Sequence, residues 1–316
     1  MSKLAAIRSA NAAFAAKGVA DAVAVFVGGT SGIGQATMEA FTRNTVSPTI
    51  YFVGRNEAAA ASITASLQRL NPSAKVTFLQ SDISLLANAY STASIIREKE
   101  SAVNLLVVSP GYMSMAGRTP TSEGLEKKLV INYYSRVLFA VALLPLLKNG
   151  SQNAELGARV LSVYAPGTEG PIIEDDMDLE RNFSLGQAAR QAAAFQSLSF
   201  EHLAKVHPAI GFIHALPGAV VTGLFRELPL WARLFVPLFS VVSTPLEDCG
   251  QGMLRLATDQ KFKTGLALVD WKGDDKDTRH GKRSWLGKAG WWKDGLPEKV
   301  WTHTEEVFQR VLGKKI

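Results

Sequence analysis

One short stretch constrains the fold of this chain more than any other: AVFVGGTSGIG, residues 24–34. It joins an apolar run to an amphipathic helical pattern, and Gly28, Gly32 and Gly34 have the spacing G-x-x-x-G-x-G. Glycine lets the backbone turn tightly and approach a pyrophosphate, and the N-terminus of the following helix offers unpaired N–H groups and a positive dipole end. The stretch therefore predicts a nucleotide-binding loop between a buried strand and a helix.

Apolar runs of strand length alternate with helical patterns through the first 270 residues. The runs are continuously apolar, which indicates strands that are buried on both faces. This order predicts an α/β fold with a Rossmann-type, doubly wound parallel sheet in a single domain. The seven expected strands cover residues 22–28, 49–54, 75–80, 103–109, 159–164, 210–216 and 265–270. The expected helices cover residues 34–44, 56–70, 87–100, 124–147 and 185–206.

Charge and composition exclude several classes of partner. The net charge of +6 over 316 residues is mild, and the scattered basic residues form no nucleic-acid-binding motif. A lone cysteine, Cys249, excludes an internal disulfide, and the five histidines lack the spacing of metal ligands, so we expect no metal site.

The two most membrane-like segments are short. Residues 1–18 lack the apolar core of a signal peptide, and they predict a surface helix rather than a weak targeting helix. The apolar run at 228–242 falls short of the roughly 20 residues that span a bilayer. We expect a cytoplasmic protein without an integral membrane segment.

Over about residues 20–272 the chain resembles the short-chain dehydrogenase/reductase family, whose glycine motif is T-G-x-x-x-G-I-G. Val27 stands where the family has Thr, and the glycines match. SDI at 81–83 matches the Asp–aliphatic pair after the third strand, and SPG at 109–111 keeps the glycine of N-A-G. LPGAVVT at 216–222 is similar to P-G-x-V-x-T. The stretches FVGGTSGIG, YFVGRN and FIHALPG are similar to those of a divergent branch of the family that is common in filamentous fungi.

The resemblance implies where a dinucleotide would bind. Asp82 and Ile83 would flank the adenine, Gly111 would let the backbone pass close to the cofactor, and residues 217–222 would lie along the nicotinamide. It also implies a dimer or tetramer, assembled through the fourth and fifth helices. The expected cofactor-binding residues are Gly28, Thr30, Ser31, Gly32, Ile33, Gly34, Arg55, Asn56, Asp82, Ile83, Gly111, Pro217, Gly218, Val220 and Thr222.

The end of the second expected strand, VGRN, indicates which dinucleotide binds. Members that bind NAD usually have Asp or Glu here, which accepts hydrogen bonds from the ribose 2′-OH. Arg55 instead offers a guanidinium suited to a 2′-phosphate, and no carboxylate in VGRN repels that phosphate. Asn56 can donate beside it or cap the next helix. We therefore expect NADP(H) rather than NAD(H).

The resemblance fails at the catalytic residues, which in the family are Asn, Ser, Tyr and Lys. Asn132 matches the family's Asn, and the Ser position falls on Tyr164, with Ser162 two residues earlier. Residues two apart on a strand point the same way, so both can face a substrate. Phe183 and Gln187 stand where Tyr and Lys are expected, and none of the six tyrosines has Lys four residues later.

Phenylalanine cannot exchange a proton and glutamine cannot lower a phenol pKa by its charge, so other groups must do the chemistry. We predict a catalytic site of Asn132, Ser162 and Tyr164, in a substrate pocket with Phe183 and Gln187. A carboxylate from the acidic run 169–178 is an alternative acid or base if burial raises its pKa. A solvated loop is the simpler interpretation of that run.

Residues 224–242 follow the P-G-x-V-x-T match, where family members place a substrate-covering lid. Trp231 within this apolar segment indicates a pocket for an apolar small molecule, although a dimer contact or a membrane-surface face remains an alternative. We expect residues 1–273 to form the catalytic domain, with the lid at about 219–245, and residues 274–316 to pack on it as a C-terminal extension.

Three functions fit these observations. The first is an NADP(H)-dependent reductase of a bulky apolar carbonyl, imine or enone, of the kind found in fungal specialised metabolism. The second is a non-redox isomerase, cyclase or dehydratase on the same scaffold. The third is a catalytically silent NADP-binding protein. The intact glycine loop favours a retained cofactor, and the missing Tyr and Lys weigh against ordinary alcohol oxidation.

Overall fold

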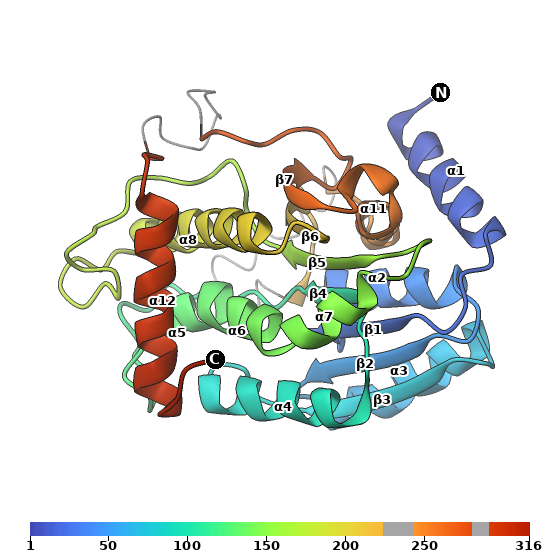
Figure 1. Cartoon of the computed structure of the whole chain (residues 1–316), viewed down its shortest axis with the longest axis horizontal. Coiled ribbons are helices and arrows are strands. Elements are labelled where there is room, and N and C mark those ends of the chain that lie inside the picture. The colour runs from blue at the N-terminus through green and yellow to red at the C-terminus, as the bar shows by residue number, and fades with distance from the viewer. Residues whose placement is uncertain (224–242, 280–290) are drawn as a thin grey trace.

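The seven apolar runs pair into one parallel sheet in the computed structural model, which describes residues 1–223, 243–279 and 291–316 (Figure 1). The strand order is β3-β2-β1-β4-β5-β6-β7. The strands are β1 (Val23–Val27), β2 (Thr49–Gly54), β3 (Lys75–Gln80), β4 (Leu105–Val108), β5 (Ala158–Val163), β6 (Ile210–Leu216) and β7 (Gly265–Asp270). The predicted doubly wound sheet is confirmed, with each strand within two residues of its expected bounds.

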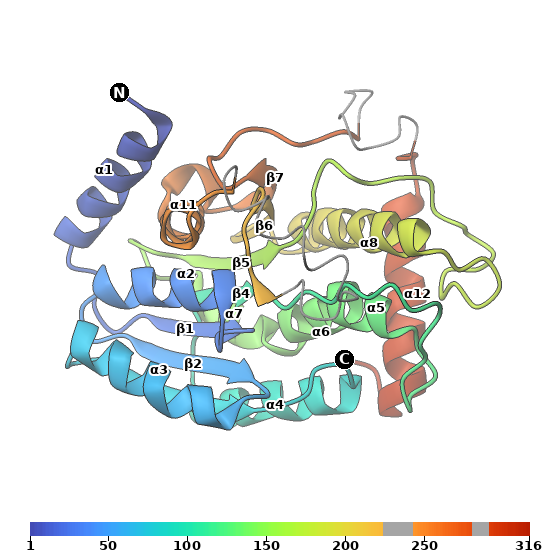
Figure 2. The ribbon, with the colours of Figure 1, turned by 180° about the vertical axis from the view of Figure 1, so that it is seen from behind.

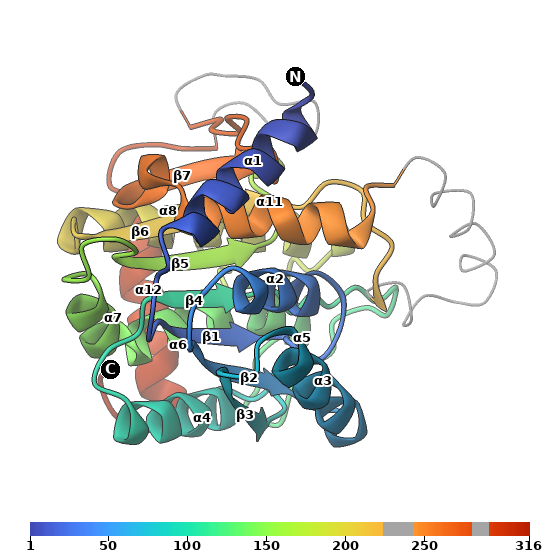
Figure 3. The same cartoon turned by 90° about the vertical axis from the view of Figure 1, so that its right-hand side faces the viewer.

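Helices cover both faces of the sheet, as its continuously apolar strands require. Figure 1 shows the face under α4, α6 and α8, and Figure 2 shows the face under α2 and α3. The N-terminal helix α1 lies along α11 (Figure 3), where Arg8 pairs with Asp248 at 2.8 Å. The long helices are α1 (Lys3–Ala16), α2 (Gly32–Arg43), α3 (Glu57–Leu70), α4 (Leu86–Lys99), α8 (Leu185–Val206), α11 (Leu246–Thr258) and α12 (Leu296–Leu312).

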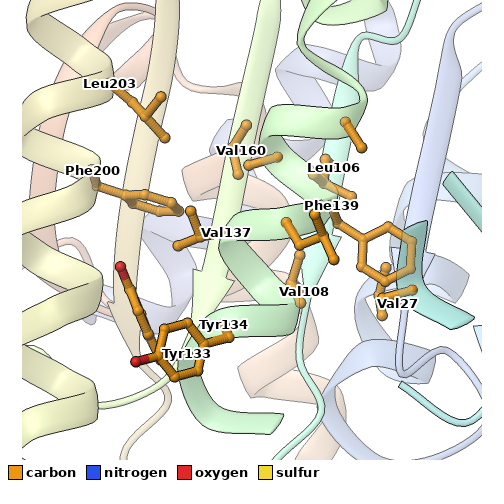
Figure 4. Packing of buried hydrophobic residues seen from close by; sticks show 14 of the residues in the cluster. Val27, Leu106, Val108, Tyr133, Tyr134, Val137, Phe139, Val160, Phe200 and Leu203 are labelled. Atoms are coloured by element: carbon orange, nitrogen blue, oxygen red, sulfur yellow. The ribbon is translucent and has the colours of Figure 1, made fainter. Parts of the chain in front are cut away.

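Alternate side chains of each strand enter two separate cores. Val25 and Val27 of β1 belong to the core under α4, α6 and α8, whereas Ala24 and Phe26 belong to the core under α2, α3 and α11. Figure 4 shows the first core, in which Phe139 of α6 packs against valines of the strands. The sheet is thus held by apolar burial on both faces.

The expected continuous helix over residues 124–147 is wrong. The chain instead forms α5 (Lys127–Leu129), the π-helical η1 (Val130–Tyr134), α6 (Ser135–Ala142) and α7 (Leu144–Gly150). A π-helical turn holds an extra residue and is often found at functional sites. Pro145 lies in the first turn of α7, where its missing N–H interrupts the helical ladder. In the described ranges no single helix has the length and apolar character of a membrane span; Lys127–Ala142 and Leu144–Gly150 meet those criteria only together, with a 59° bend between them.

Helix α12 lies across α8 and α4 (Figure 1). Buried hydroxyls fix it there: the Tyr133 hydroxyl hydrogen-bonds Ser199 of α8 at 2.6 Å and also Thr304 of α12. The Tyr134 hydroxyl lies 2.9 Å from Nε2 of His303. Part of the α8 surface, through which the family resemblance implies assembly, is therefore already covered by the chain itself.

Replacing Phe308 tests how firmly α12 is docked. Phe308 is 2% exposed in the core shared with α8, so Phe308→Ala should lower the free energy of unfolding by about 3–5 kcal/mol. The exposed neighbour Gln309 is the matched control, and Gln309→Ala should change it by less than about 0.5 kcal/mol. Urea unfolding followed by circular dichroism measures both. Equal effects of the two variants would show that α12 is not packed as described.

Candidate active site

A cavity of about 690 Å³ opens at the carboxyl ends of the central strands. The strand order reverses between β1 and β4, and doubly wound sheets bind their ligands in the crevice at such a reversal. Most of the predicted cofactor-binding residues line this cavity. They are Gly28, Thr30, Ser31, Gly32, Ile33, Arg55, Asp82, Ile83, Gly111, Pro217 and Thr222.

The glycine loop is packed too tightly for side chains. A Cβ on Gly28 would lie 2.8 Å from Oγ of Ser109, and a Cβ on Gly34 would come closer still to the same hydroxyl. Gly34 does not line the cavity, but its missing side chain lets α2 approach β4. Gly32 has φ +61°, a left-handed conformation that favours glycine. The first residues of α2 thus face the cavity, where their N–H groups and the helix dipole suit an anion.

Arg55 lies at the rim of the cavity, just beyond β2. Its side chain is exposed, and within residues 1–223, 243–279 and 291–316 its guanidinium makes no hydrogen bond or ion pair. Asn56 does not line the cavity, because its Oδ1 accepts the Ala59 N–H (3.1 Å) and caps α3. Asp82 lines it, with one carboxylate oxygen accepting the Ser84 N–H at 3.0 Å. Of these three residues, Arg55 is the one that places a cationic side chain at the rim of the cavity.

The segment after β6 divides between cavity and core. Pro217 and Thr222 line the cavity, whereas Val220 packs against the apolar core and Gly218 turns with φ +77° beside Trp271. Trp231 and residues 224–242 of the expected lid lie outside the described residues.

Tyr164 follows the last residue of β5 and lines the cavity. Its hydroxyl is directed at the carbonyl of Ala189 on α8, at 3.4 Å. The guanidinium of Arg136 lies 5.1 Å from the centroid of its ring, and the His214 ring is parallel to it within 7°. Burial raises the pKa of Tyr164 to about 12, and the positive charge of Arg136 opposes that rise.

Ser162 does not line the cavity, contrary to the expectation that it faces a substrate beside Tyr164. It is fully buried, its Oγ accepting a hydrogen bond from Nη1 of Arg136 (2.8 Å) and donating to Oε1 of Gln196 (3.2 Å). The physical reason is that β5 ends at Val163, so the alternation of a strand stops before Tyr164. Val163 and Tyr164, adjacent in sequence, both reach the cavity.

Asn132 lines the cavity from the π-helical turn, and both its amide nitrogen and its amide oxygen are hydrogen-bonded. Its Nδ2 donates to the Tyr112 carbonyl and its Oδ1 accepts the Tyr112 N–H, both at 3.0 Å. This two-bond contact fixes the segment after β4, which contributes Tyr112, Met113 and Met115 to the cavity wall. Asn132 is therefore placed to position that wall.

Comparison with known proteins agrees with this geometry. The family model described as short chain dehydrogenase matches residues 22–161. An oxidoreductase of Emericella nidulans is 33% identical over 346 residues, covering 99% of this chain and all of that protein. Short-chain dehydrogenase/reductase SAT2 of Stachybotrys chartarum is 30% identical, covering 90% of this chain and 85% of its own length. The chain belongs to the short-chain dehydrogenase/reductase family.

A solved member of the same fold is the Pseudomonas aeruginosa RhlG/NADP active-site complex. It superposes with a TM-score of 0.60 at 20% identity, covering 79% of this chain and 94% of that one. This likeness concerns the fold alone. The family assigned from the glycine motif is confirmed by the fungal relatives.

Within this family fold, α8 presents other residues to the cavity than the sequence predicted. Leu185, Gly186 and Ala189 line it, whereas Phe183 and Gln187 do not. Gln187 faces the preceding loop, where its Nε2 donates to the Pro171 carbonyl at 3.0 Å. The error arises because the long insertion before α8 obscures the register, and Ser184 caps the helix only there. Leu185 and Ala189 share one helix face, four residues apart, and neither can carry a proton or a charge.

Sequence reasoning missed Arg136, which lines the cavity next to Tyr164 and is 1% exposed. Its guanidinium donates to Ser162 Oγ (2.8 Å) and to the carbonyls of Val163 (2.9 Å), Ile131 (3.2 Å), Val108 (3.3 Å) and Pro110. Burial lowers the pKa of Arg136 to about 10, which leaves it cationic at neutral pH. The sequence does contain a signal for this residue. Arg136 is the one charged residue in the apolar stretch 129–147, and arginine is seldom fully buried unless it is paired.

The acidic run 169–178 is a solvated loop only in part, because Asp175 is exposed whereas Glu169 is not. Glu169 is fully buried, and burial raises its pKa. Its carboxylate accepts hydrogen bonds from the Gly167 N–H (2.7 Å), the Ser197 hydroxyl (2.8 Å) and the Thr278 hydroxyl (3.3 Å). Ser197 also contacts Nδ1 of His214 at 2.9 Å. Glu169 does not line the cavity, so this network braces the loop after Tyr164 from behind.

Asn132→Ala should loosen the cavity wall. The change leaves the Tyr112 N–H and carbonyl without their partner, at a cost of about 1–3 kcal/mol. Backbone amides of residues 110–116 should then exchange with deuterium faster than in the wild type. Asn71→Ala also removes side-chain bonds to backbone carbonyls, but far from the site, and it should leave those amides unchanged. Unchanged exchange in Asn132→Ala would contradict the positioning role.

Proposed function

We propose that this protein is an NADP(H)-dependent reductase of a bulky apolar carbonyl, imine or enone, on a short-chain dehydrogenase/reductase scaffold without the family's Tyr–Lys pair. The observation that carries the proposal is that one cavity joins the glycine loop to the phenol of Tyr164. A cofactor bound along the loop therefore has a proton donor within the same enclosed space.

The choice of NADP(H) rests on Arg55. An exposed guanidinium at the rim of the cavity, unpaired within the described residues, suits the 2′-phosphate, to which arginine can donate two parallel hydrogen bonds. The solved RhlG complex contains NADP, and a carbonyl reductase from chicken fatty liver with the same fold contains NADPH. These likenesses support the proposal by analogy of fold.

When bound, NADPH supplies hydride; the chain's own residues supply the proton and the shape. With a pKa raised to about 12, the Tyr164 phenol stays protonated at neutral pH, so it suits a proton donor better than a proton acceptor. Donation of a proton to the substrate accompanies reduction, whereas oxidation needs a proton acceptor. Leu185, Met113 and Met115 provide apolar, adaptable walls for the substrate.

A non-redox isomerase, cyclase or dehydratase remains the second candidate. The observation that favours it is the loss of both reactive side chains on α8, where Leu185 and Ala189 face the cavity. A protonated Tyr164 can also act as an acid without any hydride transfer. NADPH consumption separates the two functions, and a protein that binds NADPH but turns over nothing would be catalytically silent.

We further propose that copies of this chain do not associate through the part of α8 covered by α12. The buried hydrogen bonds of Tyr133 and Tyr134 to α12 support this, because assembly there would have to displace them. A dimer or tetramer, if formed, uses other surfaces.

Arg55→Ala should discriminate between the two dinucleotides. The variant loses charge-assisted hydrogen bonds to the 2′-phosphate, so its affinity for NADPH should fall by roughly 10–100-fold while affinity for NADH stays unchanged. Fluorescence titration of the purified protein with each dinucleotide measures this. Arg69→Ala, an exposed arginine at the other end of α3, is the control. Equal losses for NADPH and NADH would show that Arg55 does not read the phosphate.

Tyr164→Phe should lower turnover by roughly 10²–10⁴-fold, as expected for a lost general acid, while NADPH affinity is retained. Turnover is followed as NADPH oxidation with a panel of apolar ketones, enones and cyclic imines. Tyr112→Phe removes the other phenol that lines the cavity and should keep most activity. Full activity in Tyr164→Phe would refute the assignment. Product formed without NADPH oxidation would favour the non-redox candidate.

A further inference from the structure

Arg136 is a buried cation without an anionic partner. In the part of the chain that the structure describes, no carboxylate pairs with its guanidinium, which binds backbone carbonyls and Ser162 instead. Burying a charge is costly unless it is paired, and carbonyl dipoles compensate only in part. The site therefore retains an uncompensated positive potential beside the cavity.

That potential acts on one group in particular. The Arg136 guanidinium lies 5.1 Å from the Tyr164 ring centroid, and the bond to Ser162 (2.8 Å) holds it there. His214, parallel to the same ring, is neutral because burial and Arg136 lower its pKa well below the usual value. Lys128 of α5, also on the cavity wall, pairs with Glu126 at 3.1 Å. Arg136 is thus the net positive charge that faces Tyr164 in the described structure.

We propose that Arg136 is a positioning residue that stabilises the Tyr164 phenolate formed when the phenol donates its proton. In the proposed reduction, the substrate carbon receives hydride from NADPH and the substrate oxygen or nitrogen receives the phenol proton. The O–H bond of Tyr164 breaks and its electron pair stays on the phenolate oxygen, whose negative charge the nearby guanidinium stabilises by Coulomb attraction. A proton from solvent then restores the phenol.

Arg136 differs from the family's lysine in the helix that carries it and in its position relative to the Tyr164 ring. Arg136 comes from α6, at the carboxyl ends of β4 and β5, and not from α8, where Ala189 faces the cavity. Its guanidinium is held by hydrogen bonds to β4, β5 and η1, and it lies against the face of the Tyr164 ring. The positive charge of Arg136 lowers the pKa of Tyr164 against the rise caused by burial, and a nearby opposite charge typically has an effect of about 1–3 pH units.

The test measures the ionisation of residue 164 itself. The proposal rests on the proposed reductase function for its kinetic consequence, but this readout needs neither substrate nor NADPH. Position 164 is labelled with 3,5-difluorotyrosine, which ionises at lower pH than tyrosine, and its midpoint is followed by fluorine NMR. We expect Arg136→Gln and Arg136→Met to raise the midpoint by about 1–3 pH units relative to the labelled wild type.

Arg159→Gln is the matched control. Arg159 is the other fully buried arginine among the described residues, and it lies at the amino end of β5, away from the cavity, where it donates to the Asp259 carbonyl at 3.0 Å. Its loss should destabilise the protein without moving the midpoint. Where neither charge-free variant at 136 folds, Ser162→Ala removes the bond that holds the guanidinium against the ring, and a smaller rise is expected.

An unchanged midpoint in every folded variant at 136 and 162, or an equal rise in Arg159→Gln, would overturn the proposal. A raised midpoint in a protein that never oxidises NADPH would instead uphold the role of Arg136 and refute the reductase function. In an active enzyme, the charge-free variants should lower kcat by about 10-fold or more and shift its pH profile, while KM for NADPH stays near the wild-type value.

Discussion

A single buried guanidinium organises the functional end of this molecule. Arg136 reaches from α6 to the last residues of β4 and β5, and its N–H groups bind the carbonyls of Val108 and Val163. These carbonyls lie at the carboxyl ends of the two strands. The carbonyl dipoles accept hydrogen bonds from the cation, which lowers the cost of burying its charge. These hydrogen bonds hold the ends of β4 and β5 together and so help to shape the cavity.

Around that point the cavity divides into two chemical halves. The half at the glycine loop offers backbone amides, a helix N-terminus and the exposed Arg55, all suited to phosphate. The part next to α8 has apolar side chains, Leu185 and Ala189 of α8 and two methionines of the segment after β4. Tyr164 lines the same cavity, so a group held beside it has an anion-binding surface on one side and apolar side chains on the other.

The sequence predicted what depends on local pattern and failed where register or burial decides. The seven strands and the glycine loop follow from apolar runs and glycine spacing, and the structure agrees. The π-helical turn that interrupts the helix expected at 124–147 cannot be recognised from the apolar pattern, because the stretch remains apolar on both sides of the extra residue. Ser162 was misplaced because strand alternation was extended one residue past Val163. Phe183 and Gln187 were misplaced because an insertion of unknown conformation precedes α8. Arg136 was overlooked because one cation in an apolar helix carries no spacing motif.

The hydrogen-bond network of Glu169 behind Tyr164 makes the candidate site depend on the order in which the chain is synthesised. Glu169 accepts a hydrogen bond from Thr278, to which Trp291 donates in turn at 3.0 Å, more than a hundred residues later in the chain. On the ribosome the sheet strands emerge before these partners do. The loop after Tyr164 then holds a buried carboxylate with part of its hydrogen bonding missing, and it can settle only when the C-terminal segment arrives. A nascent chain would thus complete its glycine loop early and the hydrogen-bond network behind Tyr164 last.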